Sequence, residues 1–240
     1  MYKVLSASPT ALTSTSYYYA DCRLLARIAA VLGLAEDFRR YEDLAASIKD
    51  AFNRAFYDPA TGRYADGGQT SQACALYQGL TEPDERAKVL ARLVEAVREK
   101  DYHPDFGILG AKFVLNALVE NGGADTAYGL AAQTTYPSWG HWVAQGATTL
   151  WETWEGHESR NHIMFGDIGA WFYKTLAGIN PEVTVEALPE RVDENRLEAL
   201  AAGADIVLDG SDNFVTRHAA NRVCVRLGKP LVSGAAVRFD

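Results

Sequence analysis

The chain has 240 residues, which is the size of one large domain or two small ones. Hydrophobic residues make up 48% and charged residues 22%, so disordered, collagen-like and coiled-coil classes are excluded. The formal net charge of -8 argues against a basic phosphate-binding surface, and we expect no nucleic-acid partner. All 5 Trp and all 12 Tyr lie before residue 180, so the C-terminal part differs in composition from the rest.

The cysteines and the N-terminus indicate the compartment. Cys22, Cys74 and Cys224 form neither a C-x-x-C pair nor an even-numbered disulfide framework, so we expect buried small side chains and no metal site. Residues 1–15 contain one lysine and no apolar segment long enough for a signal peptide. No segment approaches the roughly 18 apolar residues that span a bilayer. We expect a cytoplasmic protein with no membrane partner.

Apolar residues recur at helical spacing from Tyr17 to about Ile179. A proline-containing segment, Thr81 to Asp84, is expected to begin and cap one of the helices. The faces are amphipathic rather than wholly apolar, which favours helices packed side by side in a bundle, solenoid or toroid. The expected helical segments are 24–32, 44–56, 89–97, 114–119, 127–132, a segment after Gly146, and 168–176.

The pattern changes after Asn180-Pro181. Residues 183–188 alternate like a short strand, and a polar helix is expected over 193–202. A compact β-branched strand at 205–209, a helix at 214–227 and a strand from Pro230 form a βαβ unit of a parallel sheet. Such a short segment cannot cover both faces of a parallel sheet, so we predict a fragment of a Rossmann-like α/β domain.

The densest polar and aromatic stretch runs from Tyr136 to His162. Four of the 5 Trp fall between Trp139 and Trp154, beside Glu152 and Glu155. Aromatic rings can stack on the C–H faces of a sugar, while carboxylates bind hydroxyls and transfer protons. The alternative is that the tryptophans are core residues and the charges lie on the surface; composition leaves both interpretations open.

Six strings in this part resemble the bacterial α-L-rhamnosidase family over about residues 13–179. They are YYYADCRLLA from Tyr17, GQTSQA from Gly68, DFGILGAK from Asp105, TTYPSWG from Thr134, GATTLWE from Gly146 and RNHIMFGDI from Arg160. The resemblance implies a mainly α fold for residues 1–179, part of an (α/α)6 toroid of six helical hairpins. It also implies an inverting glycoside hydrolase that removes terminal α-L-rhamnose from a rhamnose-containing glycoside without a cofactor or metal.

The resemblance also suggests roles for individual residues. An inverting hydrolase needs a general acid on the leaving oxygen and a general base that activates water. Glu152 takes the place of the general base, His162 that of a contact to a substrate hydroxyl, and Trp139 and Trp151 are candidate walls of the sugar pocket. Glu155 is a rival for the base, although we expect it to be a solvated loop acid.

The family motif that carries the general acid precedes the region matched here, and nothing before Thr13 resembles it. Because general-acid assistance contributes roughly 10²–10⁴-fold, we expect little or no hydrolysis from this chain. The missing helices of the toroid would leave apolar helix faces exposed, so we also expect self-association.

A second resemblance covers about residues 180–240. DIVLDGSDNFVTR from Asp205, with Asn221 and KPLVSGAA from Lys229, resembles the ThiF/MoeB adenylyltransferases. Polar residues at the end of a buried strand suit a ligand edge of an α/β sheet. The resemblance implies that Asp212 helps to hold ATP and Mg, with Arg217 and Asn221 on the same helix. Ser211 or Asp212 could equally be the N-cap of that helix.

Three functions follow, in order of preference. The first is the α-L-rhamnosidase-like hydrolase, the second an ATP-dependent adenylyltransferase, and the third a non-catalytic carbohydrate-binding or chimeric remnant. The Gly-rich nucleotide loop and catalytic lysine of the adenylyltransferases would precede the matched part, so competent adenylation is not expected. Ile179-Asn180-Pro181 fits both families and no Gly/Ser/Pro-rich linker separates them, from which we infer a chimera joined at this string. The alternative is a natural fusion of two degenerate modules that serves as an interaction protein.

Overall fold

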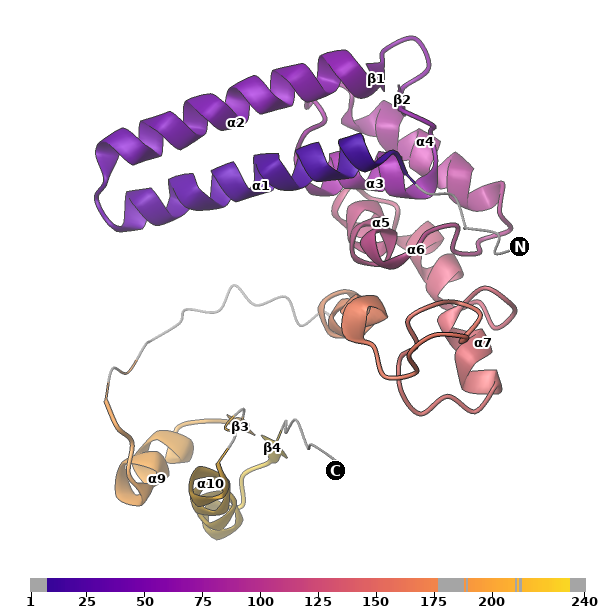
Figure 1. Cartoon of the computed structure of the whole chain (residues 1–240). Helices are drawn as coiled ribbons and strands as arrows, with labels where there is room; N and C mark the ends of the chain where they lie inside the picture. The colour runs from indigo at the N-terminus through magenta and orange to yellow at the C-terminus, as the bar shows by residue number, and fades with distance from the viewer. Residues whose placement is uncertain (1–7, 177–187, 189, 210, 212, 234–240) are drawn as a thin grey trace. The chain divides into compact units, whose positions relative to one another are not determined.

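A computed structural model of the chain describes residues 8–176, 188, 190–209, 211 and 213–233 (Figure 1). The chain divides into two compact units, Met1–Pro181 and Glu182–Asp240, and each is described by itself. The string Ile179-Asn180-Pro181, where the two resemblances meet, lies outside the described residues.

The first unit begins with two long antiparallel helices, α1 (Thr10–Val31) and α2 (Ala35–Phe56), which lie side by side (Figure 1). The turn between them contains Gly33 at a φ of +73°, a conformation that glycine adopts without steric cost. A two-stranded antiparallel ribbon follows, with β1 (Tyr57–Asp58) paired to β2 (Arg63–Tyr64).

Two further helix pairs continue the first unit. They are α3 (Gln69–Tyr77) with α4 (Arg86–Arg98), and α5 (Ile108–Glu120) with α6 (Ala124–Ala131). Helix α1 packs on α3, α3 on α5, and α5 on α8 (Asp167–Trp171). From α1 to α5, each helix in this series therefore contacts the next but one along the chain, and α5 then contacts α8, while α4 contacts α6. This is the arrangement expected for a sector of a helical-hairpin toroid.

The unit ends with α7 (Trp139–Ala144), the 3-10 helix η1 (Ile163–Phe165), α8 and the π-helix η2 (Phe172–Leu176). The helix that we predicted after Gly146 is absent: residues 147–162 form a loop. Gly146, at a φ of +80°, ends α7, and the two arms of the loop then bond to each other. The His162 N–H, for example, donates to the Leu150 carbonyl over 2.9 Å.

The expected start of a helix at Thr81–Asp84 is also wrong, because α4 begins at Arg86. The N–H groups of Leu80 and Thr81 both donate to the Ala75 carbonyl, over 3.0 and 3.2 Å, so this segment closes the C-terminal end of α3. Asn53 of α2 holds it further, since its Nδ2 donates to the Leu80 carbonyl over 2.9 Å.

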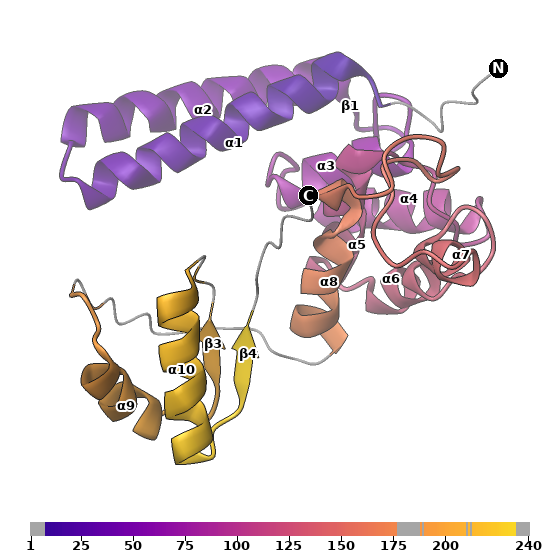
Figure 2. The same cartoon turned by 60° about the horizontal axis from the view of Figure 1, so that its bottom comes forward.

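The second unit consists of α9 (Glu194–Ala202), β3 (Val207–Asp209), α10 (Phe214–Leu227) and β4 (Leu231–Ser233) (Figure 2). Strands β3 and β4 are parallel, with Val207 opposite Leu231, and α10 connects them and contacts both. The predicted βαβ unit is therefore confirmed. The strand expected over 183–188 lies, except for Leu188, outside the described residues.

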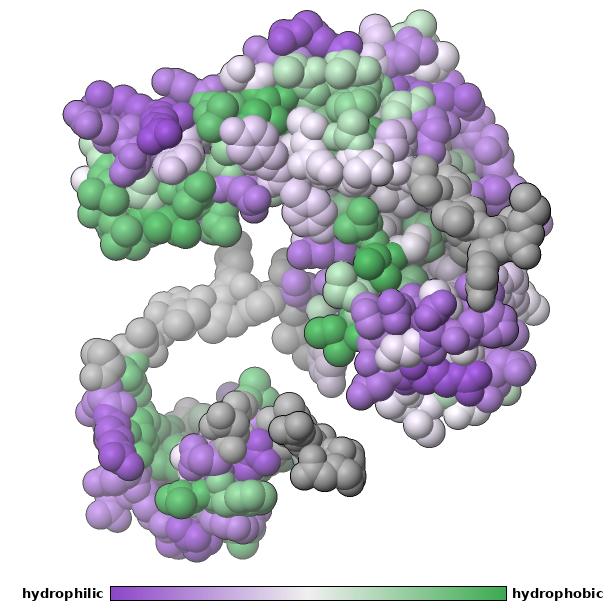
Figure 3. Space-filling view, in the orientation of Figure 1, coloured by the Kyte–Doolittle hydropathy of each residue, from purple (hydrophilic) through white to green (hydrophobic). Residues whose placement is uncertain are grey.

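Apolar side chains are exposed at the end of the α1–α2 hairpin, where Figure 3 shows them gathered on one side. Together they form what we call the hairpin patch: Leu24, Leu25, Ile28, Val31, Leu32, Leu34 and Phe38. All three cysteine thiols are buried and unpaired with one another, as the sequence predicted. Among the helices of the described residues, none has both the length and the apolar character that crossing a bilayer requires.

Candidate functional site

The loop of residues 147–162, hereafter the site loop, carries Glu152 and His162. The Glu152 N–H donates to the Ser159 carbonyl over 2.9 Å. In return, the Ser159 N–H donates to Oε2 of the Glu152 carboxylate over 3.3 Å. Glu152 is half-buried, so both its main chain and its carboxylate are held by one residue on the opposite arm of the loop.

Glu155 differs from Glu152 in its surroundings. It is exposed, and its carboxylate accepts a hydrogen bond from the Tyr136 hydroxyl over 2.8 Å. Partial burial raises the pKa of Tyr136 to about 12, and the hydrogen bond to Glu155 contributes to the rise. Glu155 is thus a surface acid bound to a tyrosine on the segment before α7.

His162 occupies the N-cap position of η1. Its Nδ1 accepts from the Met164 N–H over 3.4 Å, which fixes the orientation of the half-buried ring. The main chain of His162 pairs with Leu150, two residues before Glu152, so the predicted base and the predicted hydroxyl contact lie on the two paired arms of one loop.

Trp139 and Trp151, the predicted pocket walls, are largely covered, with exposed fractions of 7% and 6%. The Trp139 Nε1–H donates to the Phe165 carbonyl over 3.1 Å. Trp151 lies beneath the Arg160 guanidinium, whose central carbon is 4.7 Å from the ring centroid, and the backbone of Gly156 touches its edge. Both indoles pack chiefly against protein, and their contact with a sugar stays a prediction.

Trp142 and Trp154 belong to the same aromatic cluster, although nothing in the sequence distinguishes them from Trp139 and Trp151. The Trp142 Nε1–H donates to the Trp154 carbonyl over 2.9 Å, and the Trp154 Nε1–H donates to the Phe106 carbonyl over 2.7 Å. The density of four tryptophans in the interval was the available signal. Which carbonyl each indole N–H binds could not be predicted, because the acceptor of Trp154 is Phe106, which is far away in the sequence.

The GQTSQA string that begins at Gly68 has a structural role. Gln72 is buried, and its side chain accepts from the Tyr64 N–H over 2.5 Å and donates to the Gly62 carbonyl over 3.1 Å. Gln69 accepts from the Asp105 N–H and donates to the His103 carbonyl, both over 3.0 Å. These two glutamines of α3 therefore fix the β1–β2 ribbon before α3 and the loop after α4, including the start of the DFGILGAK string.

An apolar cavity of about 430 Å³ opens beside the aromatic cluster. None of Glu152, His162 and Trp151 lines it, so the cavity does not coincide with the predicted catalytic group. An apolar cavity supplies no group that transfers a proton, whereas the site loop holds the Glu152 carboxylate in place. The residues that dominate its lining are Trp139, Trp142, Val143, Leu150, Ile168 and Phe172.

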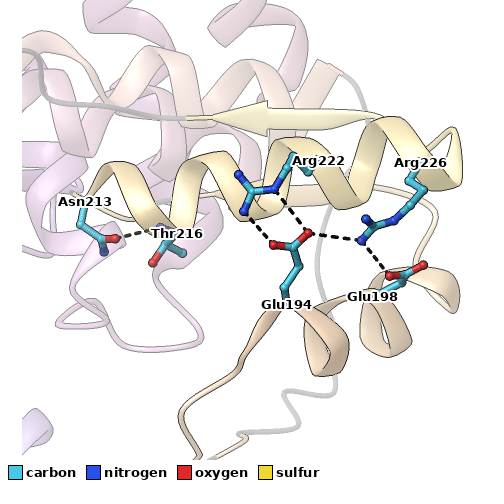
Figure 4. Close-up of polar contacts among 6 residues, drawn as sticks. All are labelled: Glu194, Glu198, Asn213, Thr216, Arg222 and Arg226. Carbon is cyan, nitrogen blue, oxygen red and sulfur yellow. Dashed lines mark hydrogen bonds and ion pairs between the residues drawn. The ribbon is translucent and has the colours of Figure 1, made fainter.

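In the second unit, Asp212 lies outside the described residues. The N-cap of α10 is Asn213, whose Oδ1 accepts from the Thr216 N–H over 2.9 Å, so the expectation of Ser211 or Asp212 there is wrong (Figure 4). Asn213 performs this role because it directly precedes the first helical turn, where a side-chain oxygen reaches the N3 amide.

Arg217 and Asn221 both lie on α10, but the structure gives them separate surroundings. The Arg217 guanidinium donates to the Ser211 carbonyl over 2.9 and 2.5 Å and lies 3.9 Å from the Asp209 carboxylate. Asn221 is exposed. The guanidinium is thus bound to the loop after β3, and the described residues do not by themselves assemble a site for ATP and Mg.

A charged cluster joins α9 to α10 (Figure 4). The Glu194 carboxylate accepts from Arg222 over 2.7 Å and from Arg226 over 3.4 Å, and Glu198 accepts from Arg226 over 2.7 Å. Hydrogen bonding to Arg222 lowers the pKa of Glu194. In the described part of the chain, no group of three or more His, Cys, Asp or Glu residues is arranged to hold a metal ion.

Sequence comparison matches the two parts of the chain to two families. The model of the bacterial alpha-L-rhamnosidase 6 hairpin glycosidase domain matches residues 2–176, and that of the ThiF family matches residues 172–240. An alpha-L-rhamnosidase of Formosa agariphila is 34% identical over 181 residues, which are 71% of this chain and 20% of that protein. The SAMP-activating enzyme E1 of Haloferax volcanii is 48% identical over 65 residues, 27% of this chain and 24% of that protein.

The crystal structure of Streptomyces avermitilis alpha-L-rhamnosidase complexed with L-rhamnose superposes with a TM-score of 0.70 and 32% identity, covering 75% of this chain and 18% of that chain. The chain spans about a fifth of the length of these rhamnosidases. Both predicted resemblances and the mainly α, toroid-type fold with a small α/β segment are confirmed. Over residues 2–176, the chain belongs to the bacterial α-L-rhamnosidase six-hairpin glycosidase family.

Proposed function

We propose that the first unit carries the general-base side of an inverting α-L-rhamnosidase site and binds a terminal α-L-rhamnosyl group. The observation that supports this most directly is the anchoring of Glu152, whose carboxylate accepts the Ser159 N–H over 3.3 Å while its own N–H donates back over 2.9 Å. A general base must be held in a fixed direction toward the water that it activates. Family membership and the rhamnose-bound relative support the choice of sugar.

In this proposal, Glu152 removes a proton from a water molecule as that water attacks the anomeric carbon. The bond from the anomeric carbon to the aglycone oxygen breaks, and a general acid must give that oxygen a proton. His162 binds a sugar hydroxyl, and the small exposed edges of Trp139 and Trp151 border the ring. Hydrolysis by this chain is slow because no acid in it resembles the family's general acid, a deficit of roughly 10²–10⁴-fold.

The test is L-rhamnose binding by ligand-observed NMR, with the wild type, Glu152→Gln and Glu155→Gln compared. We expect saturable binding by the wild type, weaker binding after Glu152→Gln, and no change after Glu155→Gln, since Glu155 is exposed and bound to Tyr136. Equal effects of the two substitutions, or no binding by the wild type, would overturn the proposal.

Hydrolysis is measured separately with p-nitrophenyl α-L-rhamnoside. We expect no clear release of p-nitrophenol from the purified chain. Clear turnover that disappears in Glu152→Ala would show that the chain carries a working acid, and so would refute the slow-hydrolysis part of the proposal. Glycan binding without any dependence on Glu152 would instead favour a non-catalytic carbohydrate-binding protein.

A second candidate function is supported by the adenylyltransferase-like segment, which is 48% identical to its archaeal relative. That function would require ATP and Mg, with Asp212, Arg217 and Asn221 as the residues implied by resemblance. Because Arg217 is already bound to Ser211 and Asp209, we expect no micromolar binding of Mg-ATP in isothermal titration. A saturable micromolar isotherm, followed by ATP–pyrophosphate exchange, would establish the adenylyltransferase instead.

A further inference from the structure

The site loop has no helix or strand of its own, although Glu152 needs a fixed position in the proposed function. Main-chain hydrogen bonds join its two arms, from Glu152 to Ser159 next to the tip and from His162 to Leu150 nearer the base. Within the tip, residues 153–158, the Gly156 N–H donates to the Thr153 carbonyl and the Gly156 carbonyl accepts from Arg160. These bonds lie inside the loop, so contacts outside it attach the tip to the rest of the first unit.

Trp154 provides such contacts from the tip. It is 2% exposed, and it is bonded twice: its Nε1–H donates to the Phe106 carbonyl over 2.7 Å, and its own carbonyl accepts from Trp142 over 2.9 Å. Its ring centroid lies 4.5 Å from that of Phe165 and 4.8 Å from that of Trp142. The side chain and the main chain of one residue thus attach the loop to two other segments.

The Phe106 end of this connection is itself held by hydrogen bonds from α3. Gln69, which is buried in α3, accepts from the Asp105 N–H and donates to the His103 carbonyl, both over 3.0 Å. The Phe106 carbonyl, which accepts from the Trp154 indole, therefore directly follows a segment that Gln69 of α3 holds in place. A continuous path of hydrogen bonds and peptide bonds runs from Gln69 to Trp154, two residues from Glu152.

We propose that Trp154 is a positioning residue for Glu152: its indole hydrogen bond to the Phe106 carbonyl fixes the loop tip and thereby the Glu152–Ser159 pairing that directs the carboxylate. The inference rests on the proposed role of Glu152 as general base. A buried carbonyl that loses its donor is costly, so deleting this one N–H favours conformations in which the loop tip moves.

The experiment compares Trp154→Phe with a matched control, Trp171→Phe. Trp171 is 1% exposed in α8, and its indole nitrogen has no hydrogen-bond partner among the described residues. Both substitutions shorten a buried aromatic side chain, but Trp154→Phe alone removes a hydrogen bond. We expect amide exchange of Glu152 and Ser159 to be about tenfold faster in Trp154→Phe and within about twofold of the wild type in Trp171→Phe.

The second readout is the Kd for L-rhamnose, which we expect to rise about threefold or more in Trp154→Phe and to stay constant in Trp171→Phe. Equal increases in amide exchange in the two variants would mean that Trp154 only fills volume, and no increase in either would remove its role. If the wild type does not bind L-rhamnose, the proposed function fails, while the exchange rates still decide whether Trp154 fixes the loop.

Should Trp154→Phe fail to fold, native-state hydrogen exchange of the wild type at low denaturant tests the same inference. The Trp154 indole N–H and the amides of Glu152 and Ser159 should exchange through one opening, with a common free energy and denaturant dependence. Exchange of the Glu152 amide through a smaller opening, with the Trp154 indole still protected, would overturn the inference.

Discussion

Gly146 directly precedes the site loop, and Gly156 lies in its tip. Both have a positive φ, of +80° and +69°. They differ in what surrounds them. A Cβ on Gly156 would lie 2.4 Å from Cε3 of Trp151, whereas a Cβ on Gly146 would meet nothing within 4 Å. The conformational requirement for glycine is thus shared, and the close approach of an indole ring is specific to Gly156.

Gly156→Ala should therefore cost more stability than Gly146→Ala. We expect about 1 kcal/mol from the backbone conformation at either position. At Gly156 the Trp151 ring must also shift, which adds about 1–3 kcal/mol. Urea denaturation followed by tryptophan fluorescence measures the difference; equal losses in the two variants would contradict the close packing of Gly156 on Trp151.

At the residue scale, the sequence predicted which residues belong to the candidate site better than it predicted which residues contact each of them. Glu155 is exposed, as expected, but its bond to Tyr136 joins residues that are far apart in the sequence and could not be inferred from local pattern. The tryptophans were consistent with both a sugar pocket and a core. The low exposure of Trp139 and Trp151 depends on Phe165, Arg160 and the fold of the site loop, which periodicity does not contain.

Among the elements, α9 and α10 show how an exposed ion-pair cluster can join two helices. Glu194 bridges Arg222 and Arg226, and hydrogen bonding to Arg222 lowers its pKa. A carboxyl whose folded pKa is depressed contributes stability above its unfolded pKa, and this contribution is lost as the pH falls through the folded pKa. The cluster is solvent-exposed, so salt should weaken it.

We accordingly expect the second unit to lose helical structure on acidification below the ordinary pKa of a glutamate, and to lose it earlier in high salt. Glu194→Gln should reduce this dependence on pH. Glu190→Gln is the matched control, because the Glu190–Arg196 ion pair does not join α9 to α10. Far-UV circular dichroism against pH measures both variants; identical pH profiles for wild type and Glu194→Gln would contradict the linkage.

The prediction of elements succeeded where a local pattern decides the structure. The helix expected over 214–227 has those bounds, since Asn213 caps its start and Gly228 ends it in the left-handed conformation. The helix expected after Gly146 is absent, because the site loop is stabilised by its own cross-arm bonds and by tryptophans buried against Phe106 and Phe165. Long-range contacts outweighed the local apolar pattern there.

At the scale of the whole molecule, the hairpin patch gathers seven exposed apolar side chains at one end of the α1–α2 hairpin. Its residues lie on α1, on the turn and at the start of α2, where Figure 3 shows a continuous apolar area. Val31 is 88% exposed. Contiguous exposed apolar surface is characteristic of an interaction site. The sequence predicted exposed helix faces in general; the structure identifies the residues.

We expect this patch to cause self-association, with a molar mass in light scattering that rises with protein concentration. The double substitution Leu24→Glu and Ile28→Glu should shift the protein toward the monomer, since it places charges within the apolar surface. Ala51→Glu, at an exposed position near the other end of α2, is the control and should leave the association unchanged. A monodisperse monomer at all concentrations would contradict the expectation.

The concentration of tryptophan in the first unit also gives the protein an unusual optical signature. All five indoles belong to that unit, and the ring centroids of Trp139, Trp142 and Trp154 lie within 5.1 Å of a neighbouring indole. Such close chromophores exchange excitation and couple in the near ultraviolet. Tryptophan emission and near-ultraviolet dichroism therefore report on the site loop and its surroundings, while the second unit, which has neither Trp nor Tyr in residues 182–240, contributes no indole signal.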